Sequence, residues 1–124
     1  MNGNRVFVDT NILLYFLKGE KPIVYFLLEK QLLISFIVEL ELLGFSKLEP
    51  NDLKLIKELL SHCQIIDIDP IIKEKTISIK QKSSLKLPDA VVLATSIRFS
   101  IPLITADKDF LRSNEKLVVW MDLS

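Results

Sequence analysis

The stretch RVFVDTNILLYFLKG, residues 5–19, decides the fold class of this chain. Residues 5–8 are β-rich and largely apolar, and this short run predicts a buried strand. The triplet Asp9-Thr10-Asn11 then gives a turn, and the unbroken apolar run at 12–18 predicts a helix that Gly19 ends. A buried strand that turns directly into a helix is typical of α/β proteins.

The rest of the chain continues this alternation of strand and helix. Apolar runs and turn-forming residues predict strands at 32–35, 64–68, 102–105 and 117–120, and helices at 22–29, 36–45, 51–61, 70–83 and 90–99. This order predicts a sandwich in which helices cover a mainly parallel central sheet. A length of 124 residues, 49% of them hydrophobic, suits a single domain over residues 1–124.

The helix expected at 36–45 has a regular pattern that predicts its buried face. Four apolar residues and a glycine follow the i, i+3, i+4, i+7 spacing, namely Phe36, Ile37, Leu40, Leu43 and Gly44. Glu39 and Glu41 flank this stripe on opposite sides. Helical geometry alone does not choose between these two glutamates as a site residue.

Charge and composition exclude several classes of protein. Lys plus Arg and Asp plus Glu number 16 each, so no global basic field marks a protein that coats nucleic acid. Any nucleic-acid contact must be local, and the basic residues near the expected site are Lys18, Lys21, Arg98, Lys108 and Arg112. The chain has one cysteine, Cys63, and one histidine, His62, which excludes an intrachain disulfide and argues against a Cys/His zinc site.

A membrane span is not expected, although the mean hydropathy is high at +0.33. The stretch that most resembles a span, residues 23–45, contains the charged residues Glu29, Lys30, Glu39 and Glu41. Translocon scales assign about 2.5–3.5 kcal/mol to an Asp, Lys or Arg near the middle of a span, so such residues offset much of the contribution of the leucines. The amino terminus lacks the pattern of a signal peptide, and we expect a cytoplasmic protein.

Three acidic residues are expected to meet at one edge of the sheet. Asp9 directly follows the first strand, Asp107 follows the strand at 102–105 by two residues, and Asp89 lies in the first turn of a helix. Sites in parallel α/β sheets form in the crevice at the carboxyl ends of the strands. Each acid alone also has an ordinary explanation as a helix cap, a helix-dipole partner or a turn residue. Together, carboxylates about 4 Å apart repel by about 4 kcal/mol at an effective dielectric of 20, so such a cluster calls for a cation.

The chemistry of these side chains indicates which cation they suit. Carboxylate oxygens without histidine or cysteine ligands suit Mg²⁺ or Mn²⁺ rather than zinc. An ion of this kind, held by a few carboxylates and completed by water and a substrate phosphate, supports hydrolysis of phosphodiester bonds. The spacing of the acids does not by itself prove this chemistry.

Four motifs, in order along the chain, carry a resemblance to a known family. They are Val8-Asp9-Thr10-Asn11-Ile12, Glu41-Leu42-Leu43-Gly44, Leu87-Pro88-Asp89-Ala90 with the helical residues 91–95, and the run LITADKDF at 103–110. In this order and in a chain of this size, they resemble the motifs of PIN-domain nucleases, particularly the VapC-type toxins of prokaryotic type II toxin–antitoxin pairs. The resemblance implies a PIN-like three-layer α/β/α sandwich.

The resemblance also implies roles for particular residues and partners. It makes Asp9, Glu41, Asp89 and Asp107 the catalytic acids that hold one or two Mg²⁺ or Mn²⁺ ions, supported through hydrogen bonds by Thr10, Asn11 and Thr105. It implies endonucleolytic cleavage of RNA, homodimerisation and inhibition by a cognate antitoxin protein.

Two positions depart from the family pattern or leave it ambiguous. Asp107 and Asp109 both match the last acidic motif, and we favour Asp107 as the ligand and Asp109 as an outer partner. Val38 stands three residues before Glu41, where many family members carry Thr or Ser. One supporting hydroxyl is therefore expected to be absent.

Other functions compete with that of a toxin nuclease. A PIN-fold RNA-binding or regulatory module with weak or no catalysis would explain Val38, although the presence of all four acids argues against it. A housekeeping RNA-processing nuclease would have the same site. A nucleotide-binding domain would carry a glycine-rich phosphate loop, and the three glycines of this chain form none.

Overall fold

A five-stranded sheet lies at the centre of the molecule. Its strands are β1 Arg5–Val8, β2 Gln31–Ser35, β3 Gln64–Ile66, β4 Leu103–Thr105 and β5 Val118–Trp120. In this computed structural model, which describes residues 4–123, the strands follow the order β3-β2-β1-β4-β5 and each neighbouring pair is parallel. The predicted α/β class is confirmed, and the sheet expected to be mainly parallel is wholly parallel in these residues.

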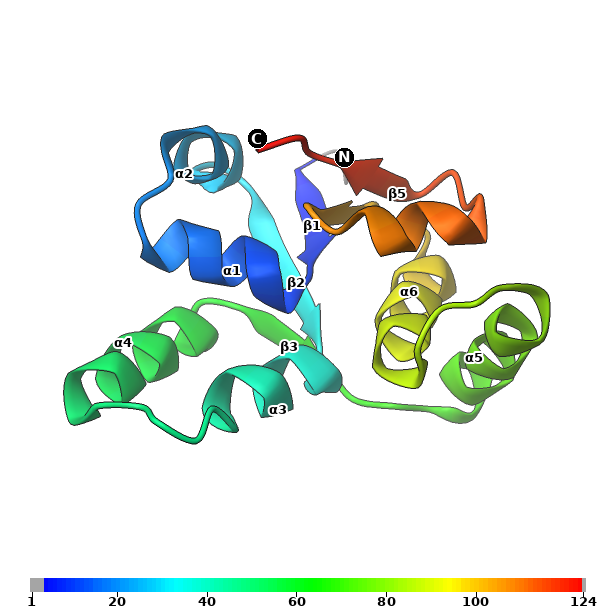
Figure 1. Ribbon diagram of the computed structural model, residues 1–124, viewed down its shortest axis with the longest axis horizontal. Coiled ribbons are helices and arrows are strands. Elements are labelled where there is room, and N and C mark those ends of the chain that lie inside the picture. The colour runs from blue at the N-terminus through cyan, green and yellow to red at the C-terminus, as the bar shows by residue number, and fades with distance from the viewer. Residues whose placement is uncertain (1–3, 124) are drawn as a thin grey trace.

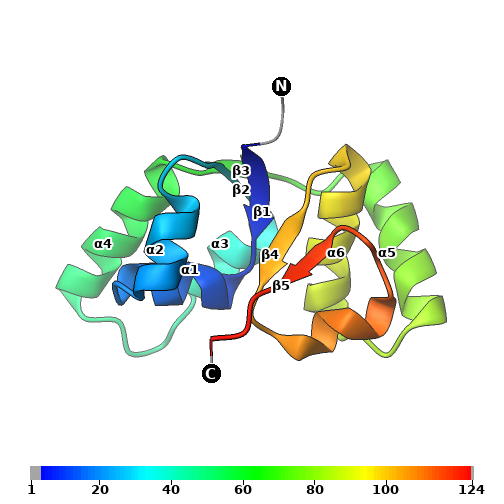
Figure 2. The ribbon, with the colours of Figure 1, turned by 90° about the horizontal axis from the view of Figure 1, so that it is seen from above.

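Helices cover both faces of the sheet. They are α1 Thr10–Leu17, α2 Lys21–Leu27, α3 Phe36–Leu43, α4 Pro50–Ser61, α5 Pro70–Lys82, α6 Leu87–Phe99 and the 3-10 helix η1 Lys108–Ser113. Figure 1 and Figure 2 show α1, α2 and α4 on one side of the strands, and α5 and α6 on the other. The predicted three-layer α/β/α sandwich is therefore confirmed.

The order of the strands places a crevice beside β1. From β1 the chain adds β2 and then β3 outward in one direction, and it returns to the other side of β1 to add β4 and β5. Right-handed crossovers then put the helices of the two halves on opposite faces. The carboxyl ends of β1 and β4 flank the point where the direction reverses, which is where parallel α/β sheets form their ligand sites.

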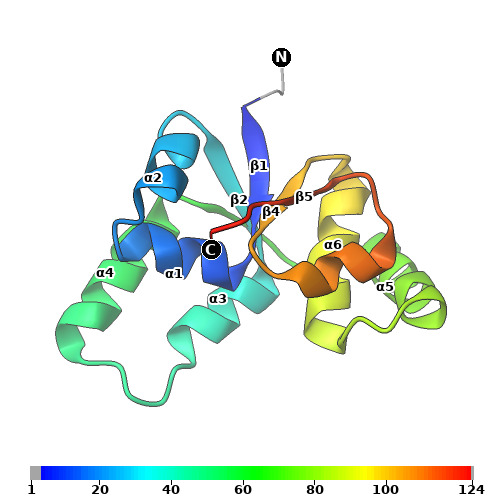
Figure 3. The ribbon, with the colours of Figure 1, turned by 45° about the horizontal axis from the view of Figure 1, so that its top comes forward.

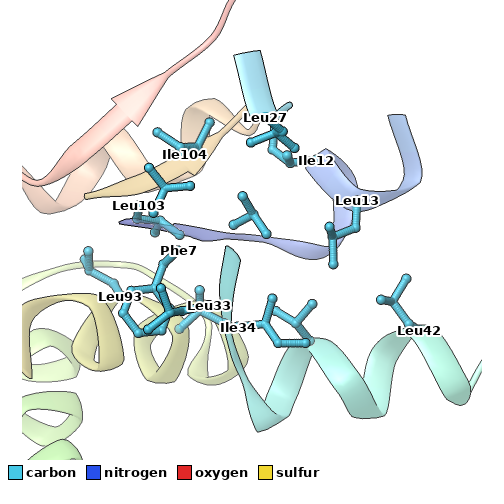
Figure 4. Close-up of a cluster of buried hydrophobic side chains, with 14 of the residues drawn as sticks. Phe7, Ile12, Leu13, Leu27, Leu33, Ile34, Leu42, Leu93, Leu103 and Ile104 are labelled. Carbon is cyan, nitrogen blue, oxygen red and sulfur yellow. The ribbon is translucent and has the colours of Figure 1, made fainter. Parts of the chain in front are cut away.

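Apolar side chains from both faces of the sheet form the core. Phe7 of β1 points toward Leu93 of α6, while Ile12 and Leu27 lie on the other side of the strands (Figure 4). All four side chains are at most 3% exposed. At about 25 cal/mol per Å² of buried apolar surface, this burial is the main stabilising contribution that holds the strand ends in place.

The predicted buried face of α3 is only partly right. Phe36 and Ile37 are half-buried and pack against the core. Leu40 and Leu43 are 58% and 37% exposed, whereas Val38 and Leu42 are fully buried. Six of the eight residues of α3 are apolar, so the i, i+3, i+4 pattern fits more than one face and cannot select the buried one. The contact of α3 with β2 and α6 makes the selection instead.

Helix ends fall where capping residues predict them. Gly19 has a φ of +77°, the left-handed conformation that ends α1 without the strain of a side chain. Asp69 caps α5 by accepting a hydrogen bond from the Ile72 N–H at 2.6 Å.

His62 is the C-cap of α4, and burial raises the pKa of the following Cys63 thiol to about 11. A thiol with such a pKa stays protonated near neutral pH and has little redox reactivity.

The apolar helices of this fold are short. Among residues 4–123, none of them combines the length and the apolar composition that a membrane crossing demands. The expectation about a signal peptide rests in part on residues 1–3, which lie outside the described part of the chain.

Candidate active site

The four acids singled out in the sequence line one cavity of about 410 Å³. Asp9 comes from the end of β1, Glu41 from α3, Asp89 from the first turn of α6, and Asp107 from the residue before η1. Figure 3 shows the starts of α1 and η1 side by side at the carboxyl ends of the strands, with α6 next to them. The fold therefore gathers carboxylates that are up to 98 residues apart, the separation of residues 9 and 107.

Asp9 is the buried member of this group, with a relative exposure of 6%. One carboxylate oxygen caps α1 by accepting the Ile12 N–H at 3.0 Å, and the other accepts a hydrogen bond from the Thr105 hydroxyl. Burial raises the pKa of Asp9 to about 6, opposed by these two hydrogen bonds and assisted by the charges of Asp107 and Asp89. The Asp9 carboxylate is thus fixed in a buried position that disfavours its charged form.

Thr105 connects the two strand ends that form the cavity. Its side chain is fully buried, donates to Asp9 and accepts the Asp107 N–H at 3.0 Å. This hydroxyl fixes the position of Asp9 and the direction in which the chain leaves β4. The predicted supporting contact of Thr105 thus has a geometric basis.

The structure separates the two candidate glutamates of α3. Glu41 lines the cavity and accepts a hydrogen bond from the Thr10 hydroxyl at 2.6 Å. Glu39, two residues earlier on the helix, is not among the residues that line this cavity. Asn11 does line it, beside Thr10 at the start of α1. The motif thus selected the glutamate that faces the other acids.

Asp107 and Asp109 differ in the same way. Asp107 lines the cavity, while Asp109 forms an ion pair with Arg112 at 3.1 Å and donates its backbone N–H to Asp107 at 2.9 Å. Asp109 therefore orients Asp107 through the backbone. The assignment of Asp107 as the metal ligand and Asp109 as its outer partner stays a prediction.

Asp89 experiences the charge of the other acids directly. Burial raises the pKa of Asp89, and the neighbouring charges of Asp107, Glu41 and Asp109 raise it further, while Lys86 opposes them. Within residues 4–123, the ion pairs are Arg98 with Asp69 and Arg112 with Asp109, so none of the cavity acids has a cationic side-chain partner. The cavity thus concentrates negative charge that no side-chain ion pair of the described residues balances.

The donor set of the cavity fits a hard divalent cation. All four acids and the neighbouring Thr10 and Asn11 offer oxygen ligands, the type that Mg²⁺ and Mn²⁺ prefer. Among the described residues, no three acidic, histidine or cysteine side chains are yet grouped tightly enough to form a ready ligand set. Like charges disfavour a closer approach of the carboxylates in the absence of a cation, and the exposed Glu41 is held by the Thr10 hydroxyl.

Four apolar residues that line the cavity were not recognised as site residues in the sequence, namely Leu14, Phe45, Val92 and Phe110. Leu14 and Val92 stand one helical turn after Asn11 and Asp89, and Phe110 stands three residues after Asp107. Phe45 stands four residues after Glu41, just beyond the end of α3. This spacing is a signal that the sequence contained.

Val38, the departure from the family pattern, does not lie at the cavity. Its side chain is fully buried in the core near Leu42. The expected loss of a supporting hydroxyl therefore leaves the cavity lining unchanged. Two of the basic residues suggested for RNA contact, Arg98 and Arg112, are instead paired with Asp69 and Asp109.

We predict that Thr105→Val lowers the free energy of unfolding by about 1–3 kcal/mol, because a buried hydrogen bond to a carboxylate is lost. Without this hydroxyl, the pKa of Asp9 rises above about 6. Thr95→Val is the matched control, since Thr95 is equally buried but bonds only the Val91 carbonyl at 2.7 Å. Urea unfolding and NMR titration of the Asp9 carboxyl measure the two effects. An unchanged Asp9 pKa in Thr105→Val would contradict this role.

Fold and cavity together define a class: α/β sandwich proteins whose site is a set of carboxylates at the carboxyl edge of a parallel sheet. Within this class, the chain belongs to the PIN domain family, whose model matches residues 6–116. The identification that the sequence motifs suggested is confirmed. Among curated proteins, no sequence matches the chain significantly.

Solved structures of toxin–antitoxin systems resemble the chain over nearly its whole length. A chain of a toxin-antitoxin complex from Klebsiella pneumoniae is 32% identical, with a TM-score of 0.79, covering 92% of this chain and 95% of that one. A chain of DNA-bound VapBC from Salmonella typhimurium is 18% identical, with a TM-score of 0.79 and coverage of 93% and 96%. A chain of VapBC-1 from nontypeable Haemophilus influenzae is 21% identical, with a TM-score of 0.76 and coverage of 95% and 97%. The last two share the fold, and the first is also similar in sequence.

Proposed function

We propose that this protein is a Mg²⁺- or Mn²⁺-dependent endoribonuclease and the toxin of a type II toxin–antitoxin pair. The observation that carries the proposal is the single cavity lined by Asp9, Glu41, Asp89 and Asp107, in which negative charge has no cationic side-chain partner among the described residues. Membership of the PIN domain family and similarity to a chain of a toxin-antitoxin complex support it.

The four acids would hold the metal in this cavity. Asp9 is fixed by Ile12 and Thr105, and Glu41 is held at the mouth by Thr10. Each carboxylate oxygen has two lone pairs, so the oxygens of Asp9 keep acceptor capacity after these hydrogen bonds. When bound, a divalent ion supplies an activated water and neutralises charge on the phosphodiester that is cleaved.

The same acids make cleavage depend on the cation. An RNA phosphate that enters a cavity with four carboxylates is repelled unless a positive charge compensates them. Thr105 and the Asp109 N–H orient Asp9 and Asp107, so these two carboxylates do not need to be reordered when substrate arrives. Metal removal should therefore abolish hydrolysis, because the phosphate to be cleaved no longer enters the acidic cavity.

Partners follow from the same proposal. The neighbours in structure are chains of toxin–antitoxin complexes, which supports a cognate antitoxin protein as the inhibitor of this chain. We infer homodimerisation and a cytoplasmic location from the family resemblance. A small DNA-binding protein encoded beside this chain would distinguish a toxin from a housekeeping RNA-processing nuclease.

We expect the purified protein to cleave single-stranded or looped RNA with Mg²⁺ or Mn²⁺ and to stop when EDTA is added. Glu41→Gln should lower the cleavage rate by roughly tenfold to a hundredfold, because one oxygen donor loses its charge. Glu39→Gln is the matched control on the same helix and should keep the parent rate. Gel assays of a labelled RNA measure these rates.

Two outcomes would contradict the proposal. Cleavage that continues in EDTA would show that the carboxylates do not act through a metal. Equal cleavage rates in Glu41→Gln and Glu39→Gln would show that the cavity takes no part in the reaction. RNA binding without cleavage under all metals would favour the alternative of an RNA-binding or regulatory module.

A further inference from the structure

A second cavity of about 380 Å³ lies beside the acidic one, on the other side of the residues that follow β4. Its lining includes Tyr15, Ala106, Lys108, Trp120 and Asp122. Figure 2 shows the chain after β5 running between α1 and η1, the elements that carry Tyr15 and Lys108. We call this hollow the Trp120 pocket.

The Trp120 pocket is built onto the same strand ends as the candidate active site. Trp120 pairs with Thr105 in the register of β4 and β5, and Thr105 bonds Asp9. The indole N–H of Trp120 donates to the Ala106 carbonyl at 3.2 Å, one residue before Asp107. The indole is thus fixed directly beside a segment that lines the acidic cavity.

Aromatic rings and ammonium groups are combined in this pocket. The Lys108 ammonium, which lines the pocket, lies 5.2 Å from the centre of the Trp120 ring. The Lys18 ammonium is not part of the lining but lies 5.9 Å from the centre of the Tyr15 ring, which is. Neither lysine forms an ion pair within residues 4–123. Lysines of this kind can exchange a ring contact for a phosphate, since an ammonium binds phosphate as a point charge.

We propose that the Trp120 pocket binds a nucleotide of single-stranded RNA that flanks the cleaved phosphodiester, with its base against Trp120 or Tyr15 and its phosphate at Lys108. This rests on the proposed nuclease function. Stacking on an aromatic ring and a nearby cation are the two contacts by which proteins hold single strands without reading their sequence. A base inside a duplex cannot enter such a hollow, so the pocket favours single-stranded or looped RNA.

The charge of the molecule supports this location. The chain has no net charge, and the acidic cavity repels RNA when no metal is bound, so local cations must provide attraction. Among the described residues, the pocket lining contains one acidic residue, Asp122, and one basic residue, Lys108, so it lacks the excess of acidic residues that the acidic cavity has. Lys108 immediately follows Asp107, so a phosphate at its ammonium lies next to the acidic cavity.

Trp120 is the only tryptophan of the chain and reports directly on this pocket. We expect an eight-nucleotide oligoadenylate, added in EDTA and low salt so that cleavage does not occur, to quench its fluorescence in a saturable manner. Trp120→Leu and Lys108→Ala should each weaken binding by about tenfold, which equals about 1.4 kcal/mol and lies in the range of base stacking. Trp120→Phe keeps a ring and should retain most of the affinity.

Matched controls exist for both kinds of change. Tyr25 of α2 is 68% exposed and Lys57 of α4 is exposed, and neither lines the Trp120 pocket. Tyr25→Leu and Lys57→Ala should bind fluorescein-labelled oligoadenylate like the parent in anisotropy titrations. Circular dichroism checks that Trp120→Leu is folded. If Trp120→Leu does not fold, Lys108→Ala still tests the pocket, because Lys108 is exposed.

The outcomes separate this proposal from the proposed nuclease function. Metal-dependent cleavage with unchanged affinity in Lys108→Ala and Trp120→Leu, and no fluorescence response to oligoadenylate, would overturn the pocket and leave the nuclease standing. Saturable quenching without cleavage in any metal would support the pocket and reject the nuclease. A fluorescence change that depends on protein concentration and is insensitive to RNA would assign the pocket to a second copy of the chain and overturn the proposal.

Discussion

Asp9→Asn is expected to make the metal-free protein more stable at pH 7. In the presence of Mg²⁺ or Mn²⁺, it should lower the rate of RNA cleavage by roughly a hundredfold or more. The carboxylate is 6% exposed and its pKa is raised from 3.8 to about 6, chiefly by burial. An amide has no charge to desolvate and can still cap α1 by accepting the Ile12 N–H. The Thr105 hydroxyl can turn to accept from the amide.

The pH dependence of this gain follows from the direction of the shift. Below pH about 4 the Asp9 carboxyl is protonated in both states, so parent and variant should have similar stability. Between pH about 4 and 6 the unfolded chain loses the proton and the folded protein retains it, so the stability of the parent falls as pH rises. Above pH about 6 the difference should be constant, at about 1–3 kcal/mol in favour of the variant.

Asp69→Asn is the matched control for this measurement. Asp69 also caps a helix, by accepting the Ile72 N–H, but this hydrogen bond and the neighbouring Arg98 lower its pKa. Its charged form is favoured by folding, so Asp69→Asn should destabilise the protein at pH 7 and lose this effect as pH falls. Urea unfolding in EDTA from pH 4 to 8 measures both. A variant at Asp9 that is less stable than the parent at pH 7 would contradict the burial argument.

Much of the fold could be predicted because local signals and global topology agree in this chain. The strand, turn and helix over residues 5–19 appear as β1, Asp9 and α1, and Gly19 adopts the left-handed conformation that the helix end requires. Prolines stand in the first turn of α2, α4, α5 and α6, where a missing N–H is harmless. Such agreement between levels is a property of sequences that specify one fold.

The buried face of α3 could not be predicted, because the helix is apolar on several sides. Leu40 and Leu43 fitted the periodicity but are exposed, and Val38 and Leu42 take the buried positions. Only the packing against β2 and α6 distinguishes these alternatives. For the same reason, helical periodicity does not distinguish Glu39 from Glu41 as a site residue. The family motif, not the periodicity, indicates Glu41.

The candidate site was predictable to the extent that strand ends identify it. Asp9 and Asp107 follow strands that become neighbours, so the topology alone brings them to one edge. Asp89 reaches that edge from the opposite direction, at the start of α6, which no single-element pattern reveals. The Trp120 pocket depends on the pairing of β5 with β4, and no sequence pattern indicates that Trp120 lies beside Thr105.

Mg²⁺ at about a hundred times its Kd is expected to raise the free energy of unfolding of the parent by about 2.7 kcal/mol, because only the folded state gathers the ligands. The rise should be absent in Asp9→Asn and smaller in Glu41→Gln. Glu39→Gln should show the full rise, since Glu39 does not line the cavity. Thermal unfolding with and without Mg²⁺ measures these differences, and NaCl at matched ionic strength controls for general screening.

The direction of the pKa shifts adds a second test of the same binding. Asp9 and Asp89 both have raised pKa values, so protons compete with the ion for the cavity as pH falls. Stabilisation by Mg²⁺ should therefore be larger at pH 7.5 than at pH 5, the opposite of the trend for the metal-free protein. Equal stabilisation of parent and Asp9→Asn at both values would mean that the ion binds outside this cavity. In that case the excess negative charge beside Asp9 would have to be a feature of the fold that no cation offsets.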